Sequence, residues 1–283
     1  MTDTPRDNPT PIQICLFPVA GYGTRFLPAT KAQPKEMLPI VTKPLIQYGV
    51  EEAVAAGMHT MAFVTGRNKR AIEDHFDITY ELEDQISGTQ KEIYLSSIRQ
   101  LIDQCTFTYV RQTKMRGLGD AILTGEPLVG QQPFGVILAD DLCHDDESVL
   151  LQMTRLYAQH QCCIVAVEEV RREDVCKYGI VSGQALPDGS IRIEQMVEKP
   201  AIDQAPSNLA MIGRYILTPD IFDILRETPP GNGGEIQLTD ALKVLAARNK
   251  VIGFPFSGRR FDCGSVEGFV EATNFYFQHQ TRG

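Results

Sequence analysis

The fold is decided by a segment that runs from residue 12 to residue 23, IQICLFPVAGYG. Residues 12–20 are mostly apolar and suit a β-strand, whereas Gly21 and Gly23 end the apolar run. An apolar strand that stops at glycines is typical of a buried strand entering a loop at the edge of a parallel sheet. The segment therefore predicts that the ordered chain opens with a buried strand followed by a glycine loop.

Further along the chain, the apolar pattern alternates between strands and helices. After the first strand we expect a helix over residues 45–56, a strand over 61–64, a helix over 69–76, a charged helical region over 79–104 interrupted at Ser87-Gly88, a strand over 107–110, a helix over 120–128 and a strand over 134–138. Such alternation predicts an α/β fold with a Rossmann-like, doubly wound, mixed but mainly parallel sheet and helices on both faces. Ligands of these folds lie beyond the carboxyl ends of the strands, here the loops after Ala20, Val110 and Leu138.

The second half of the chain is richer in strand patterns. We expect strands at residues 162–168, 178–182, 191–198, 209–217 and 251–254, and helices at 147–160, 219–225, 238–248 and 265–278. We interpret this half as a β-rich elaboration folded onto the first sheet. The predicted organisation is a flexible N-terminal arm (1–11) and a single domain (12–283), divided into 12–160, 161–264 and a closing helix in 265–283.

Composition and charge argue against several classes of protein. The 283 residues carry a formal net charge of −9, which disfavours nucleic acid as a partner because its polyanionic backbone is held by basic surfaces. No apolar run reaches the roughly 18 to 20 residues of a membrane span, and the N-terminus lacks the basic-then-apolar order of a secretory signal. We therefore expect a cytoplasmic protein with no membrane partner. The seven cysteines contain no CxxC pair and the five histidines show no metal-ligand spacing, so neither residue type indicates a metal site.

The glycine loop after the first strand is locally basic. Residues 25–43 hold four cations and one carboxylate in an otherwise acidic chain. Gly21 and Gly23 would let backbone N–H groups approach an anion, and Arg25 and Lys35 add charge suited to phosphate oxygens. The loop therefore predicts a polyphosphate site, although a GxG pattern alone is equally compatible with a glycine turn beside surface lysines.

The loop is part of a longer string that carries a family resemblance. GxGTR followed by PxTKxxPKEMLP, over residues 21–39, resembles the signature of the sugar-1-phosphate nucleotidylyltransferases. Seven later segments stand in the order typical of that family: VTGRNKRAIEDHFD (64–77), VRQ with RGLGDA (110–121), LADD (138–141), KYGIV (177–181), VEKP (197–200), GGEIQLTDAL (233–242) and FDCGSVEG (261–268). The resemblance extends over residues 14–272. The residues of the PKEMLP and FDCGSVEG motifs favour the branch of the family that transfers uridylyl groups.

The resemblance implies a fold of the nucleotide-diphospho-sugar transferase type and a defined reaction. Glucose 1-phosphate would attack the α-phosphate of UTP in line, giving UDP-glucose and pyrophosphate. Mg²⁺ is the implied cofactor, because nucleoside triphosphates react as magnesium complexes. Residues 12–160 would bind the nucleotide and residues 161–264 the sugar phosphate. Members of the family are commonly oligomeric, so we expect a homo-oligomer, either a dimer or a tetramer.

The resemblance also implies which residues form the site. The catalytic cations would be Arg25 and Lys35, and the metal ligands Asp140 and Asp262. The remaining candidates for the nucleotide are Ala20, Gly21, Gly23, Glu36, Gln112 and Gly117. Those for the sugar phosphate are Gly179, Glu198 and Lys199 and, as weaker candidates, Gly213, Tyr215, Lys177 and Glu235.

Two of these assignments can also be argued from the residues themselves. Asp140 follows an apolar strand, so it stands at a carboxyl end suited to a magnesium ligand, although the adjacent Asp141 is a competing candidate. The amide of Gln112 offers both a donor and an acceptor, so it could match the imide edge of uracil bidentately.

Three other functions remain open from the sequence. The same chemistry could use dTTP, because thymine differs from uracil by one methyl group, which is worth only about 1 to 3 kcal/mol of discrimination. A non-catalytic sugar-nucleotide-binding regulator would have lost a reactive group, whereas every implied charged group is present here. A nicotinamide dehydrogenase shares the expected fold, but its fingerprint needs a third glycine where this chain has Phe26.

Overall fold

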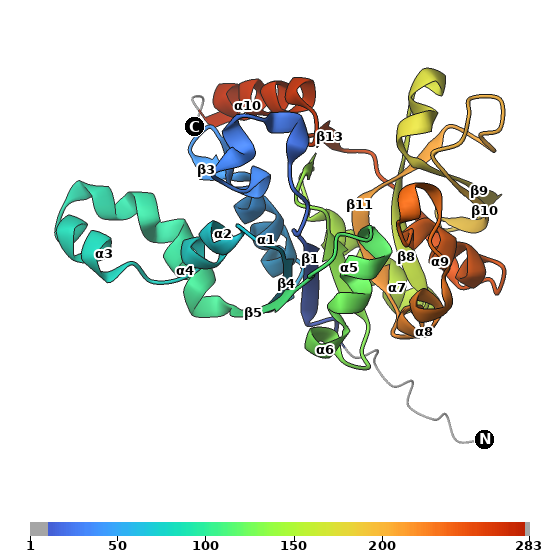
Figure 1. Ribbon diagram of the computed structural model, residues 1–283, viewed down its shortest axis with the longest axis horizontal. Coiled ribbons are helices and arrows are strands. Elements are labelled where there is room, and N and C mark those ends of the chain that lie inside the picture. Colours follow the sequence, from blue (N-terminus) through green and yellow to red (C-terminus); the bar gives the residue numbers. More distant parts are fainter. Residues whose placement is uncertain (1–10, 281–283) are drawn as a thin grey trace.

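The computed structural model describes residues 11–280 and is built around one nine-stranded mixed sheet (Figure 1). The strand order across the sheet is β5-β4-β1-β6-β11-β8-β12-β10-β9. Along the chain these strands are β1 (Ile14–Pro18), β4 (Thr60–Thr65), β5 (Thr106–Arg111), β6 (Phe134–Ile137), β8 (Cys163–Glu169), β9 (Gly179–Ala185), β10 (Ile191–Glu198), β11 (Leu209–Leu217) and β12 (Val251–Pro255). Residues 1–10 of the expected arm lie outside the described residues, so its flexibility stays a prediction.

Parallel pairs are concentrated in the N-terminal half of the sheet. β5, β4, β1 and β6 run parallel to one another. In the other half, β11 is antiparallel to β6 and β8, β12 is parallel to β8, and β10 is antiparallel to β12 and β9. The mixed α/β sheet with a β-rich second half is confirmed, and the antiparallel pairs belong to that second half.

β1 is buried on both faces, as its apolar sequence predicts. Cys15 and Phe17 belong to one hydrophobic cluster, and Ile14 and Leu16 to another on the opposite face. Successive side chains of a strand point to opposite faces of the sheet, so a strand covered on both sides must be apolar throughout. The first strand is therefore the divider between the two cores.

Helices cover both faces of the sheet. α1, α4 and α7 contribute residues to the cluster around Phe17, whereas α5, α8 and α9 contribute residues to the cluster around Leu16. The helices are α1 (Leu45–Ala55), α2 (Arg70–His75), α3 (Tyr80–Ile86), α4 (Ser96–Gln104), α5 (Leu118–Thr124), α6 (Glu126–Val129), α7 (Val149–His160), α8 (Asp220–Glu227), α9 (Leu238–Ala246) and α10 (Val266–Gln280).

Two helical segments are more divided than a single pattern suggests. The charged region 79–104 forms α3, a 3-10 helix over Gln90–Leu95, and α4, and it projects from the body of the molecule (Figure 1). The break falls at Ser87-Gly88, as expected, where Gly88 has a φ of +72°. The expected helix 120–128 is split between α5 and α6 beside Pro127, because proline fits the first turn of a helix but not its interior.

Two short antiparallel ribbons were not predicted from the sequence. β7 (Asp141–His144) pairs with β13 (Arg259–Asp262), which places Asp262 opposite Asp141. β2 (Pro39–Ile40) pairs with β3 (Lys43–Pro44). Strands of two to four residues carry too few positions to show a period-two pattern. The β7–β13 ribbon nevertheless determines which residues meet at the candidate site, because it places Asp262 next to Asp141.

The aromatic residues of α10 mostly form core contacts. Phe269 meets Phe26 with ring centroids 5.6 Å apart, and Phe275 lies 5.2 Å from Phe261. α10 therefore closes over the glycine loop and the β7–β13 ribbon, whereas Phe277 remains 57% exposed. Within residues 11–280, no helix combines the length and the apolar character needed to cross a membrane.

Candidate functional site

A cavity of about 810 Å³ lies where the glycine loop, the β7–β13 ribbon and the β-rich half meet. Its volume is in the range of small-molecule sites. It gathers eight residues singled out from the sequence: Arg25, Asp140, Gly179, Glu198, Lys199, Gly213, Tyr215 and Asp262. Two further weaker candidates, Lys177 and Glu235, line it as well. Residues more than two hundred positions apart in the chain thus meet in one cavity.

Three of the charged candidates converge on Gly264, which sequence reasoning did not single out. A side chain at this position would begin 2.9 Å from Asp140 Oδ2, 3.0 Å from Asp262 Oδ1 and 3.2 Å from Arg25 Nη1. The glycine backbone N–H also donates a hydrogen bond to Asp262 Oδ1 over 3.1 Å. The absence of a side chain at Gly264 therefore keeps two carboxylates and one guanidinium around a common space.

The donor set at this space fits a hard divalent cation. Mg²⁺ prefers oxygen ligands and is commonly held by one or two carboxylates together with substrate phosphates and water. Asp140 and Asp262 supply two such carboxylates. Among the described residues, no group of three or more His, Cys, Asp or Glu side chains could hold a metal ion. The arrangement thus suits an ion that completes its coordination with a substrate.

Lys35 lies directly beside this space. It stands in a 3-10 helix (Lys35–Met37), and its Nζ donates to Asp140 Oδ2 over 2.5 Å. Burial by itself would raise the pKa of Asp140, but the charge and hydrogen bond of Lys35 hold that pKa below its usual value. Burial likewise opposes the charged form of Lys35, yet Asp140 raises the pKa of the lysine. Both groups are therefore ionised at neutral pH.

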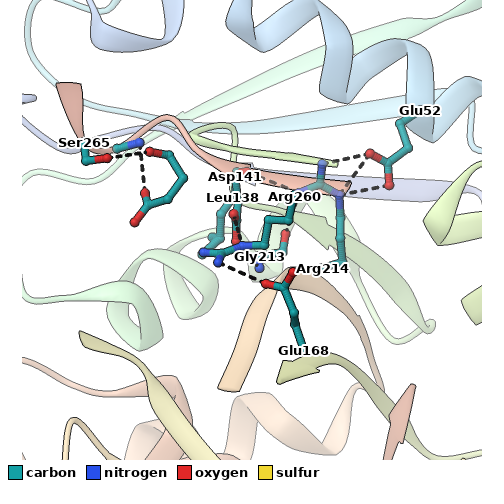
Figure 2. Close-up of polar contacts among 10 residues, drawn as sticks. Glu52, Leu138, Asp141, Glu168, Gly213, Arg214, Arg260 and Ser265 are labelled. Carbon is teal, nitrogen blue, oxygen red and sulfur yellow. Dashed lines mark hydrogen bonds and ion pairs between the residues drawn. The ribbon is translucent and has the colours of Figure 1, made fainter. Parts of the chain in front are cut away.

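Asp141, the competing metal candidate, already has a donor on each oxygen (Figure 2). Its Oδ1 accepts from Arg260 Nε over 2.5 Å and its Oδ2 accepts from the backbone N–H of Gly213 over 2.6 Å. A carboxylate held by two protein donors is poorly placed to bind a cation as well. This geometry favours Asp140 over Asp141 as the metal ligand, and it assigns Asp141 to fastening β7, β11 and β13 together.

Two buried arginines of this region escaped the sequence reasoning. Arg260 bonds Asp141 and Glu168, and its guanidinium lies 5.0 Å from the centre of the Tyr178 ring. Arg214, only 1% exposed, binds Glu52 through several nitrogen–oxygen contacts, the shortest of 2.8 Å (Figure 2). Arg260 directly precedes the FDCGSVEG segment, and this position is the only feature of the sequence that could have indicated it as a site residue. Nothing in the sequence marks Arg214 and Glu52 as partners.

Two of the nucleotide candidates, Ala20 and Gln112, lie at the carboxyl ends of neighbouring parallel strands. The backbone N–H of Gln112, just after β5, donates to Thr65 O at the end of β4 over 2.8 Å. A side chain at Gly66 would begin 2.9 Å from Ala20 O, just after β1. The loops that follow β1, β4 and β5 therefore lie side by side, as the fold predicts for a ligand site.

The glycines in these loops have distinct structural reasons. Gly23 has a φ of +67°, a left-handed conformation that favours glycine, whereas a side chain at Gly21 would meet nothing within 4 Å. Gly117 has a φ of +94°, and a side chain there would begin 2.8 Å from Glu235 Cβ and 2.9 Å from Ile236 O. Gly117 thus allows the loop before α5 to pack closely against residues 235–236, of which Glu235 lines the cavity.

Two nucleotide candidates have side chains that already bind other residues of the protein. The carboxylate of Glu36 is buried and accepts from the buried Lys69 Nζ over 2.7 Å, so any contact with a base would have to come from its backbone. Burial raises the pKa of Glu36 and lowers the pKa of Lys69. The amide nitrogen of Gln112 donates to Asp120 over 2.7 Å and, over 3.4 Å, to Gly117 O. The bidentate contact of Gln112 with uracil stays a prediction, and its nitrogen would have to exchange the longer of these two contacts to make it.

The sugar-phosphate candidates form the β-rich side of the cavity. Glu198 Oε2 accepts from Thr239 Oγ1 over 2.6 Å. A side chain at Gly179 would begin 3.0 Å from Thr239 Oγ1 and 3.1 Å from that same carboxylate oxygen, so it would crowd the Glu198–Thr239 pair. A side chain at Gly213 would meet Asp141 instead, which makes this glycine a packing requirement of the Asp141 network.

Lys199 combines an exposed cation with a strained backbone. Its φ is +44°, which is uncommon for a residue other than glycine, and its side chain is 54% exposed. Its Nζ lies 3.6 Å from Glu198 Oε1. Strained conformations cluster at binding sites, where the surrounding structure holds a side chain in a required place. Lys177 differs, because it is bound to Asp174 over 2.6 Å.

Comparison with known proteins gives a consistent family. The sequence matches the nucleotidyl transferase family over residues 18–279. It is 63% identical to a UTP–glucose-1-phosphate uridylyltransferase of Pseudomonas aeruginosa over 266 residues, covering 93% of this chain and 95% of that protein.

Two solved structures give the same picture. A UDP-glucose pyrophosphorylase complexed with UDP-glucose matches with 60% identity and a TM-score of 0.88, covering 95% of this chain and 99% of that one. A UTP-bound UDP-glucose pyrophosphorylase from Acinetobacter baumannii matches with 40% identity and a TM-score of 0.86, covering 94% and 93%.

Proposed function

Because the chain belongs to the nucleotidyl transferase family, we propose that it is an enzyme transferring the uridylyl group of UTP to α-D-glucose 1-phosphate. The products are UDP-glucose and pyrophosphate. The names of the similar proteins support this choice of substrates. The observation that carries the proposal is the convergence of Arg25, Asp140 and Asp262 on Gly264, in a cavity that also holds Glu198 and Lys199.

The reaction is a displacement at the α-phosphorus of UTP. A phosphate oxygen of glucose 1-phosphate forms a new bond to this phosphorus, the bond to the oxygen bridging the β-phosphorus breaks, and pyrophosphate leaves. Little covalent chemistry falls to the protein, so its contribution is to align the two substrates and to offset charge. Arg25 and Lys35 neutralise the triphosphate and the leaving pyrophosphate.

Mg²⁺ is the cofactor that the carboxylates at Gly264 would hold. Asp140 and Asp262 would bind it, together with phosphate oxygens of the nucleotide. When bound, the ion would offset the negative charge on the transferring group. Lys35 keeps Asp140 ionised, because the lysine cation lies 2.5 Å from the carboxylate oxygen. Ionised Asp140 is the form that a cation needs.

Each substrate has its own group of residues. The backbone around Ala20 and Gly21, together with Gln112, binds the nucleotide at the ends of β1 and β5. Glu198 accepts hydrogen bonds from the sugar hydroxyls, and Thr239 fixes one of its oxygens. The exposed cation of Lys199 pairs with the phosphate of the sugar phosphate.

Steady-state pyrophosphate release tests the proposal. The purified protein would be assayed with Mg²⁺, glucose 1-phosphate and, in separate reactions, UTP, dTTP, ATP, CTP and GTP. We expect release with UTP to exceed release with the other nucleotides. Release mainly with dTTP would assign the thymidylyl reaction, and no release from a folded protein that binds UDP-glucose would assign a non-catalytic regulator. The cytoplasmic location and the dimeric or tetrameric state stay predictions, the second of which light scattering would check.

A further inference from the structure

The amide of Gln112 is held in one orientation by its neighbours. Its Nε2 donates to Asp120 Oδ2 over 2.7 Å and to the carbonyl oxygen of Gly117 over 3.4 Å. Both partners are hydrogen-bond acceptors, so both favour the orientation in which the NH₂ group of the amide, and not its oxygen, faces them. Asp120 is 4% exposed, and its second oxygen accepts from Arg116 Nη2 over 2.7 Å. A buried carboxylate accepts strongly but cannot donate, and it therefore rejects the flipped amide.

The oxygen of the same amide has no such partner. Within residues 11–280, Gln112 Oε1 accepts no hydrogen bond, and no fully buried side-chain oxygen is left unsatisfied. This oxygen is therefore in contact with solvent rather than with another protein group. It stands in the loop after β5, next to the loops after β4 and β1. The site thus presents an acceptor to whatever base lies there.

We propose that Asp120 is a positioning residue that sets the base selectivity of the site, by turning the Gln112 amide so that only its oxygen faces the nucleotide. The inference rests on the proposed function, because it takes Gln112 as the base contact. Uracil and thymine both carry an N3–H that donates to such an oxygen. Cytosine has a lone pair at N3, which would face the amide oxygen and repel it. The Asp120 carboxylate therefore selects an imide base over cytosine without touching it.

Asp120→Asn tests the inference with little change of shape. The asparagine amide can present either oxygen or nitrogen to Gln112, so the flipped orientation of Gln112, which offers N–H to the base, becomes accessible. We expect the ratio of kcat/KM for UTP to that for CTP to fall at least tenfold. The ratio for UTP to dTTP should stay within about twofold, because both bases have the same imide edge. The KM for glucose 1-phosphate should not change.

The matched control removes the other partner of Asp120. Arg116 is 57% exposed and bonds only the second oxygen of the Asp120 carboxylate, so Arg116→Gln leaves the contact with Gln112 in place. This variant should keep the parent protein's ratio of kcat/KM for UTP to that for CTP. If Asp120→Asn fails to fold, as judged by circular dichroism, Asp120→Ser carries the same test, because the shorter side chain withdraws the carboxylate that fixes the Gln112 amide.

Dissociation constants for UTP and CTP, measured by calorimetry without the sugar phosphate, separate this inference from the proposed function. A parent protein that turns over no nucleotide but prefers UTP in binding would overturn the reaction and leave the selectivity test intact. The role of Asp120 would be overturned if the Asp120 variant kept the parent ratio of kcat/KM for UTP to that for CTP. It would also be overturned if kcat/KM fell equally for UTP, dTTP and CTP.

Discussion

The Nζ of Lys35 lies 2.5 Å from Oδ2 of Asp140, although the two residues are 105 positions apart in the chain. The lysine comes from the glycine loop and the aspartate from the turn between β6 and β7. This pair joins the predicted phosphate loop to the predicted metal carboxylates. It therefore brings two motifs that are separate in the sequence into one cluster of charged groups.

Asp140→Asn should abolish most of the turnover while leaving the fold intact. The variant keeps the shape of the side chain but removes the charge that a divalent cation and Lys35 both require. Removing a group that stabilises transition-state charge costs about 100- to 1,000-fold in kcat. Steady-state kinetics with varied Mg²⁺ would measure the loss, and circular dichroism would check the fold. A variant with the full magnesium-dependent rate would transfer the assignment to Asp141.

Lys199→Ala should raise the KM for glucose 1-phosphate about tenfold or more with little effect on the KM for UTP, because it removes a charge-assisted contact to the sugar phosphate. Lys177→Ala is the matched control. Lys177 lines the same cavity with a side chain that is 61% exposed, but it is already bound to Asp174. Initial rates with each substrate varied would distinguish the two lysines. Unchanged sugar-phosphate kinetics in the Lys199 variant would remove that lysine from the site.

Arg214→Met should lower the free energy of unfolding by about 3 to 5 kcal/mol, because it leaves the Glu52 carboxylate without its cation and against an apolar side chain. Replacing both residues, Arg214→Met with Glu52→Met, should recover much of this loss, since a buried pair can often be exchanged for apolar side chains of similar size. Urea unfolding of the single and double variants would measure the coupling. An equal fall in the free energy of unfolding of the single and double variants would show that Arg214 and Glu52 are not coupled in stability.

Acid should weaken the turn between β9 and β10. Hydrogen bonds from the Ser190 side chain, His160 and the Ser190 backbone lower the pKa of Asp188 from 3.8 to about 2. A carboxyl whose pKa is lowered by folding stabilises the folded state above its unfolded pKa, and this contribution is lost as the pH falls toward the folded value. The loss should therefore lie between about pH 4 and pH 2, and Asp188→Asn should not show it. An NMR titration of Asp188 with a midpoint near 4 would contradict this prediction.

Strongly patterned elements could be predicted closely, and contacts between distant polar groups could not. The strands over residues 191–198 and 209–217 have the predicted bounds. The first mixes apolar and polar residues after the turn at Pro187-Asp188-Gly189, and the second is mostly apolar and ends before Pro219. The β7–β13 ribbon is too short and too polar to show a pattern.

At the site, the residue types were predictable and their orientations were not. The sequence indicates Gln112 as a base contact, but its amide is turned by Asp120, which a loop brings to it. The buried carboxylate of Glu36 depends in the same way on Lys69, and Arg214 depends on Glu52, 162 positions away. The first contact depends on how the loop between the two residues folds, and the other two depend on the packing of segments further apart, so no short sequence pattern predicts them.

The most direct test of the reacting centre is a crystal structure of the protein with UDP-glucose and Mn²⁺, in which anomalous scattering locates the ion. We predict one ion bound by Asp140 and Asp262 beside Gly264, with the uracil N3–H donating to Gln112 Oε1 and the sugar hydroxyls donating to Glu198. An ion held by Asp141, or a uracil ring away from the loops after β1 and β5, would contradict it.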